Sequence, residues 1–229
     1  MLPGSQADQL RHIDPLGAWW VSGLVLFVLV VIAITNVSSP RKWRLLAQAT
    51  FRMRLGRSTL REEIDLRDRT LVGLLLAAVC VLGMFAWQAA VRSGMPDAPS
   101  YPVWAGLVAA SVVLQSVLVI TIGTLLRVDN GLVEYMYTGL LIFILAGMVL
   151  LPVVALVAFR PEWRAELLLF GKVLLLVLLV YRWVRGAWIG WGEGVPARYI
   201  IIYLCTAEIV PLLLLLDVLR QPLPHLFHH

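Results

Sequence analysis

Six apolar stretches, each long enough to cross a bilayer as a helix, constrain this chain more than any other feature. Crossing about 30 Å of hydrocarbon takes a helix of about 20 residues. The six stretches are 16–35, 71–91, 103–126, 135–159, 165–188 and 199–219. In lipid, every backbone N–H and C=O must be satisfied within its own segment, which favours helices. The sequence therefore predicts an all-α polytopic membrane protein, a six-transmembrane-helix bundle forming a single membrane domain over 1–229.

The composition excludes the common soluble classes. Of the 229 residues, 60% are hydrophobic and 14% are charged, whereas a soluble domain is about 45–50% apolar and about 25% charged. This excludes an ordinary soluble enzyme, a disordered chain and a collagen-like fibre. Cys80 and Cys205 both fall inside apolar runs, where we expect them to behave as small hydrophobic residues rather than as a disulfide or a zinc site.

Basic residues are distributed unevenly between the two sets of connections. Thirteen lie in the connections after the first, third and fifth stretches, and five lie on the opposite side. Nine of the thirteen are in 37–69, and the others are Arg127, Arg182, Arg185 and Arg198. Because Lys and Arg accumulate in cytoplasmic loops, the sequence predicts 37–69 in the cytoplasm and both termini outside.

The connection 37–69 is basic and apolar together. An apolar stripe with helical spacing runs from Trp43 to Leu55, and arginines lie beside it. This is typical of a helix lying in the membrane interface with its arginines on anionic lipid phosphates. The lipid- or partner-binding residues that we predict are Trp43, Arg44, Phe51, Arg52, Arg54, Arg57, Arg61, Glu62 and Glu63. Two interpretations stay open, a lipid-lying connector and a docking surface for a protein partner. The segment lacks the aromatic stacking platforms of a nucleic-acid site.

Polar residues inside the apolar stretches are the candidates for function, because charges near the bilayer centre are costly. The intramembrane candidates are Glu208, Lys172, Gln115, Ser111, Thr206 and Cys205. Pro211 and Pro152 are predicted to bend their helices and to leave the carbonyls of Ala207 and Met148 open.

Two interpretations compete for the intramembrane polar candidates. In the first, Glu208, Lys172 and Gln115 join neighbouring helices by polar contacts, with a Lys172–Glu208 pair between the fifth and sixth stretches. In the second, Glu208 beside the Pro211 break is an ion, proton or substrate site. Pairing with Lys172 would keep Glu208 ionised and make it a poorer proton carrier.

The motifs of common enzymes and cofactor sites are missing from the sequence. All four histidines, His12, His225, His228 and His229, lie in the tails, so the helices offer no histidine pair for haem and no His-rich metal site. We expect no cofactor and no metal. There is also no phosphate-binding loop, dinucleotide fingerprint or hydrolase motif. An enzyme acting on lipid or isoprenoid substrates stays a third interpretation, with Arg182, Arg185 and Arg198 as phosphate ligands.

Two stretches carry a family resemblance. One is the basic loop ending in Leu60-Arg61-Glu62-Glu63, and the other is the segment Tyr203-Leu204-Cys205-Thr206-Ala207-Glu208-Ile209-Val210-Pro211-Leu212-Leu213. The second is similar to a C-terminal YLCTLEILPLL-like signature, with Ala207 and Val210 as conservative departures. Together they resemble an uncharacterised multi-spanning membrane family of the Bacteroidetes, a domain-of-unknown-function family. The resemblance implies a bacterial inner-membrane protein, in which the termini predicted outside are periplasmic, and it implies no activity.

The sequence therefore favours a non-enzymatic protein. The leading hypothesis is an assembly, scaffold or accessory component of an envelope complex, with a membrane-protein partner or a second copy of the chain and with anionic lipids at the cytoplasmic face. The alternative is a small ion- or proton-coupled transporter that works through Glu208, with Lys172 and Gln115 in support.

Overall fold

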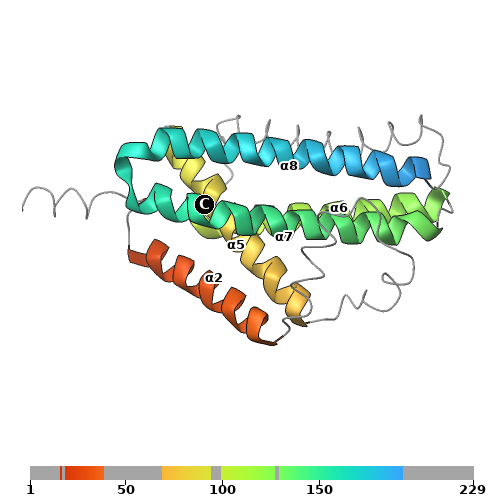
Figure 1. Ribbon diagram of the computed structural model, residues 1–229, viewed down its shortest axis with the longest axis horizontal. Coiled ribbons are helices and arrows are strands. Elements are labelled where there is room, and N and C mark those ends of the chain that lie inside the picture. Colours follow the sequence, from red (N-terminus) through yellow and green to blue (C-terminus); the bar gives the residue numbers. More distant parts are fainter. Residues whose placement is uncertain (1–15, 17–18, 39–68, 94–98, 127–128, 193–229) are drawn as a thin grey trace, which may run out of the picture.

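Five long helices make up most of the chain that the structure describes. This computed structural model describes residues 16, 19–38, 69–93, 99–126 and 129–192. The helices are α2 (Trp19–Ser38), α5 (Arg69–Arg92), α6 (Tyr101–Leu126), α7 (Asp129–Phe159) and α8 (Arg164–Gly192), with a short 3-10 turn, η2 (Pro161–Trp163), between α7 and α8 (Figure 1). No strand occurs within these described ranges.

The all-helical class is confirmed for the described residues, and all five helices are long and apolar enough to cross a membrane. They lie over the first five predicted stretches. The sixth stretch, 199–219, and the amphipathic segment 37–69 lie outside the described residues, apart from Val37, Ser38 and Arg69 at helix ends. The six-helix count therefore stays a prediction.

The helix ends differ from the predicted ends for local reasons. The described part of α2 begins at Trp19, and of the residues before it only Leu16 is described. α7 begins at Asp129, six residues before the predicted start. Asp and Asn favour helix starts although they are too polar to register as a membrane span. α8 continues to Gly192, four residues beyond the predicted end.

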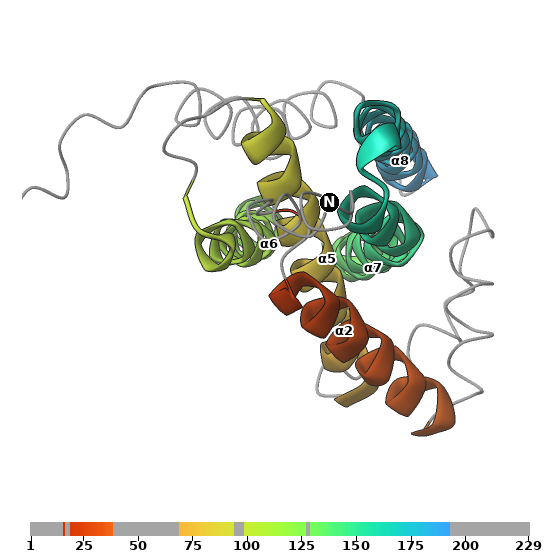
Figure 2. The ribbon, with the colours of Figure 1, turned by 90° about the vertical axis from the view of Figure 1, so that its left-hand side faces the viewer.

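The helices divide into a buried pair and three flanking helices. α5 contacts α2, α6 and α7, while α7 also contacts α6 and α8; viewed from one end, α5 and α7 lie at the centre (Figure 2). Their largest fully buried apolar side chains include Met84 on α5 and Leu150 on α7. The flanking helices instead expose apolar side chains such as Leu26, Leu114 and Leu176, as suits surfaces surrounded by lipid.

Glycines allow the central helices to approach closely. A Cβ atom added at Gly147 of α7 would lie 2.6 Å from Cα of Ala78 on α5. One added at Gly83 of α5 would lie 2.7 Å from Cα of Ala105 on α6. Membrane helices lack a hydrophobic drive toward one another, so they use such small-residue contacts to gain van der Waals packing. These two contacts fix α5 between α6 and α7.

A buried amide also joins the central pair. Gln88 of α5 is 0% exposed, and its Nε2 donates to the carbonyl of Val154 on α7 over 3.2 Å. Pro152 lies two residues away, inside α7, and the helix continues past it to Phe159. The proline therefore does not end the helix, while the open carbonyl at Met148 stays a prediction.

Replacing Gln88 tests whether the stabilising hydrogen bond of its Nε2 and the cost of burying its Oε1 offset each other. Its Nε2 is bonded, but its Oε1 has no hydrogen-bond partner among the described residues, and an unsatisfied buried acceptor costs about 1–3 kcal/mol. We expect Gln88→Leu to leave the melting temperature in detergent nearly unchanged, because it removes one bond together with one unsatisfied atom. Gln88→Glu should lower the melting temperature clearly, because it buries a carboxyl. A large loss with Gln88→Leu would contradict this account.

Candidate functional site

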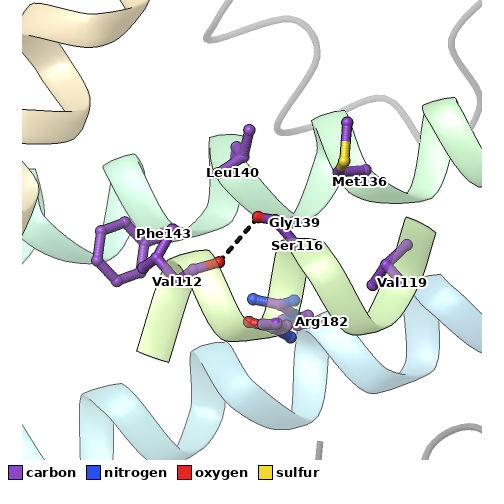
Figure 3. A pocket seen from close by; sticks show the side chains of 9 residues that line it. Val112, Ser116, Val119, Met136, Gly139, Leu140, Phe143 and Arg182 are labelled. Atoms are coloured by element: carbon purple, nitrogen blue, oxygen red, sulfur yellow. Dashed lines mark hydrogen bonds between the residues drawn. The ribbon is translucent and has the colours of Figure 1, made fainter. Parts of the chain in front are cut away.

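A small polar hollow lies between α6, α7 and α8, and we call it the Arg182 hollow. Its polar lining comes from Gln115 and Ser116 of α6 and from Arg182 of α8 (Figure 3). The rest of the lining is apolar, including Val119 of α6 and Phe143 of α7. The hollow has a volume of about 20 Å³, which is about the room that one water molecule needs.

The side chain of Arg182 packs against the backbone of α7. A Cβ atom added at Gly139 would lie 3.0 Å from Nη2 of Arg182 and 3.3 Å from its Cζ. Gly139 itself is buried. The absence of a side chain at position 139 is therefore what admits the guanidinium to the α7 surface, and Figure 3 shows Arg182 beside Gly139.

The hydroxyl of Ser116 is already bonded within its own helix. Its Oγ donates to the carbonyl of Val112 over 2.8 Å (Figure 3). Such bonding to the preceding turn is common for serine inside a helix. The Ser116 proton is thus used inside α6, which leaves the amide of Gln115 and the guanidinium of Arg182 as the groups that give the hollow its polar character.

The hollow lies inside the candidate membrane spans, near one end of them. Arg182 is ten residues before the end of α8, and Gly139 is ten residues after the start of α7. Each therefore lies about 15 Å from its helix end at about 1.5 Å per residue. Within the candidate membrane spans, Arg182 is six residues before the end of Pro161–Trp188, and Gly139 is three residues after the start of Met136–Phe159. A charged side chain at such a depth marks a functional or structural site, because its burial is costly.

Further polar groups lie at the same level. Arg185, almost one turn beyond Arg182 on α8, is only 4% exposed. The hydroxyl oxygen of buried Thr138 and Nε1 of Trp183 lack a hydrogen-bond partner among the described residues. Several buried polar atoms therefore lie at one level of α7 and α8, although buried polar atoms are normally paired.

The structure brings one predicted candidate into this site. Gln115 lines the Arg182 hollow. Ser111, one turn earlier on α6, is exposed, and its hydroxyl donates to the carbonyl of Val108 over 2.7 Å. Lys172 is exposed on α8, ten residues before Arg182. Lys172 was predicted to pair with Glu208, which lies outside the described residues, and the charged side chain that shares the hollow with Gln115 is Arg182.

The other predicted candidates lie outside the described residues. In the C-terminal segment these are Cys205, Thr206, Glu208 and Pro211, and in the basic segment Trp43, Arg44, Phe51, Arg52, Arg54, Arg57, Arg61, Glu62 and Glu63. The Lys172–Glu208 pair and the lipid-binding surface therefore stay predictions. In the described ranges, no three His, Cys, Asp or Glu side chains come together as a metal site requires.

Arg182 and Arg185 were interpreted from the sequence as markers of the cytoplasmic face and, in the enzyme interpretation, as phosphate ligands. The structure places them inside α8, with seven further helical residues after Arg185. The signal that could have found them is the aromatic and apolar run Ala187-Trp188-Ile189, which continues the helix beyond the arginines. A count of basic residues on each side of the membrane takes no account of where the helix ends.

Comparison with known proteins identifies a family and no activity. The family described as a domain of unknown function, DUF4271, matches residues 21–219. Comparisons with curated proteins and with solved structures found no match. The family match includes nearly all of the five described helices, the Arg182 hollow and the segment around Glu208. The chain therefore belongs to the DUF4271 family, a domain of unknown function.

Proposed function

We propose that the protein is a non-enzymatic component of a bacterial inner-membrane assembly, with a scaffold or accessory role toward another membrane protein. The observation that supports this most directly is the Arg182 hollow. Its guanidinium packs directly against the α7 surface at Gly139, and the space left holds about one water molecule. Polar groups packed in this way suit helix–helix contact, as in other membrane bundles.

The flanking helices supply surfaces for a partner. α6 packs on the centre with one side, while Val113, Leu114, Val117 and Ile120 are exposed on the other. These side chains form an apolar face that a partner's transmembrane helix can cover. Trp19 and Trp188 are exposed near the ends of α2 and α8, where aromatic residues anchor helices at membrane interfaces.

Site-specific photo-crosslinking tests this role. A photoreactive residue at Leu114, which is exposed on α6, should give a discrete heavier adduct in native membranes, and the adduct should contain the same partner in repeated experiments. The matched control is Val157 on α7, which is fully buried and should give no intermolecular adduct. Adducts with lipid alone at Leu114, together with a monomer in mild detergent, would contradict the proposal.

The same proposal includes an orientation. The bundle end at which α6 ends and α7 begins faces the cytoplasm, together with 37–69 and its anionic-lipid contacts, and both termini are periplasmic. The support is the excess of Lys and Arg in the connections on that side, eleven against five once Arg182 and Arg185 are assigned to the interior of α8, since basic residues are retained in the cytoplasm during insertion.

Reporter fusions give a direct prediction for this orientation. A fusion after residue 128, between α6 and α7, should be active only with a cytoplasmic reporter, and a fusion after residue 160, between α7 and α8, only with a periplasmic one. Replacing the arginines between 41 and 61 by glutamine should weaken this preference, because most of the charge difference lies there. The reverse pattern of activity in the unmodified chain would refute the orientation.

Ion- or proton-coupled transport is a second candidate. The observation that favours it is that Gln115 and Arg182 line one hollow at membrane depth, since polar groups inside a bundle mark many ion pathways. In proteoliposomes, a flux that depends on this route should fall strongly with Arg182→Gln, Gln115→Leu and Glu208→Gln, but not with the exposed Lys172→Gln. Flux that is unchanged in all four variants would exclude these residues from a transport mechanism.

A further inference from the structure

We propose that the face of α8 around Lys172 docks a transmembrane helix of a different membrane protein, and that this helix carries an Asp or Glu side chain at the depth of Lys172. The inference rests on the proposed scaffold role and names the chemistry of a partner. It concerns a face of α8 rather than the exposed face of α6, so the two proposals can fail separately.

Lys172 lies near the middle of its membrane span. It is 11 residues after the start and 16 residues before the end of the candidate span Pro161–Trp188, or about 16 Å and about 24 Å along the axis at about 1.5 Å per residue. The residue is exposed on the surface of the bundle. Because a charge that faces hydrocarbon near the bilayer centre is costly, we expect a neutralising group to cover this surface.

No carboxylate within the described ranges lies where it can neutralise Lys172. The acidic residues described are Asp129, Glu134, Glu162 and Glu166. The first two lie near the start of α7, at the opposite end from the start of α8 (Figure 1). Glu162 is ten residues away in η2. Glu166 is six residues away on α8, or about 9 Å along the axis and about 120° around it, whereas side chains that meet on a helix are three or four residues apart.

The membrane interface is also too far away for the ammonium group. Trp163 is 66% exposed at the start of α8, where aromatic side chains mark the interface. It is nine residues from Lys172, or about 13 Å. The four-carbon stem of lysine leans toward that end but extends only about 6 Å. Snorkelling therefore leaves the ammonium group about 7 Å below the interface, which favours a protein carboxylate over a lipid phosphate.

The side chains around Lys172 form a surface that fits one helix. They follow the alternating three- and four-residue spacing of a helix-packing seam, and we call them the Lys172 stripe: Ala165, Leu169, Lys172, Leu176 and Leu179. Leu169 and Leu176, one turn to either side of Lys172, are 64% and 59% exposed. Gly171 is instead buried against Phe85 and Val153, and α8 lies at the edge of the bundle (Figure 2). A single charged residue in such a seam selects the partner and its register.

The charge selects a different protein rather than a second copy of this chain. Two copies that pack α8 on α8 about a twofold axis along the membrane normal place the same residue of each copy face to face. The two Lys172 side chains would then repel each other in a medium of low dielectric constant. A carboxylate on another protein's helix instead forms a charge-assisted hydrogen bond with the ammonium group, and polar contacts of this kind join membrane helices.

Photo-crosslinking in native membranes tests the surface. A photoreactive residue at Leu176 should give a discrete adduct with one membrane protein. Lys172→Met should reduce this adduct at least tenfold, whereas Lys172→Arg should retain it. The control position is Phe170, which is 56% exposed but lies about 160° around α8 from Lys172, and it should give lipid adducts only. Lipid adducts alone at Leu176, an equal protein adduct at Phe170, or an adduct that Lys172→Met leaves unchanged would overturn the proposal.

A charge exchange tests the chemistry of the partner. The protein captured at Leu176 should contain an Asp or Glu within a transmembrane segment. Lys172→Glu should abolish the adduct, and lysine in place of that acidic residue should restore it. The melting temperature of each Lys172 variant in detergent should equal that of the wild type, because the side chain is exposed. A captured protein without an intramembrane acidic residue, or a failure of the exchange to restore the adduct, would overturn the proposal.

Two further comparisons separate this inference from the other hypotheses. Glu208→Gln should leave the Leu176 adduct unchanged. A loss equal to that of Lys172→Met, at an unchanged melting temperature, would mean that the carboxylate belongs to this chain and would overturn the proposal. A partner captured at Leu114 of α6 but not at Leu176 would overturn this inference alone and leave the proposed scaffold role standing.

Discussion

Gly147→Val is expected to unfold most or all of the protein. The first atom of any side chain at this position would lie 2.6 Å from Cα of Ala78, and backbone cannot move aside without shifting α5 as a whole. Overpacking of a close contact costs about 1–3 kcal/mol and occasionally more, and we expect the upper end or beyond here. The measurement is the yield and melting temperature of monodisperse protein in mild detergent.

Gly106→Val is the matched control for this prediction. A Cβ atom at Gly106 of α6 would meet nothing within 4 Å, and valine is a better helix former than glycine. We expect Gly106→Val to keep the wild-type yield and melting temperature or to raise the latter slightly. Equal losses at Gly147 and Gly106 would mean that the close α5–α7 approach is not what stabilises the bundle.

Gly139→Leu is expected to have the second-largest effect, through the Arg182 hollow. A Cβ atom at position 139 would lie 3.0 Å from Nη2 of Arg182, and the longer side chain would take the place of the guanidinium on α7. The charge would then have to move within an apolar span, so we expect a loss of about 2 kcal/mol or more. The loss is measured as a fall in melting temperature in detergent.

A second substitution separates this mechanism from simple crowding. The group that opposes Gly139 is the far end of a side chain, whereas the group that opposes Gly147 is backbone. Arg182→Ala should therefore restore part of the stability that Gly139→Leu removes, while no side-chain truncation should restore Gly147→Val. If Arg182→Ala and Gly139→Leu are additive, the guanidinium does not occupy the position described.

The sequence was sufficient for the five described helices, because length and hydropathy decide which segments can cross a bilayer. Its errors were at helix ends, where polar residues such as Asp129 begin α7 outside the apolar stretch. An acidic residue in the first turn of a helix is favourable, and hydropathy alone does not predict such positions.

The site was predictable only in part. Gln115 was identified because an amide at membrane depth is unusual by itself. The role of Arg182 was missed because it depends on Gly139, a residue 43 positions away that has no side chain. Close approach across helices depends on crossing geometry, which a single sequence does not contain. The burial of Arg185 depends on geometry in the same way.

The central position of α5 has a consequence for biogenesis. Its two closest backbone contacts, through Gly83 and Ala78, are with helices that the ribosome makes afterwards. Until α7 has left the translocon, the Gln88 amide has no acceptor at Val154 and must be tolerated by lipid or by insertion factors. Chains that stop after α6 should therefore be substrates for membrane quality-control proteases, and the completion of α7 should be the step at which the nascent protein becomes resistant to them.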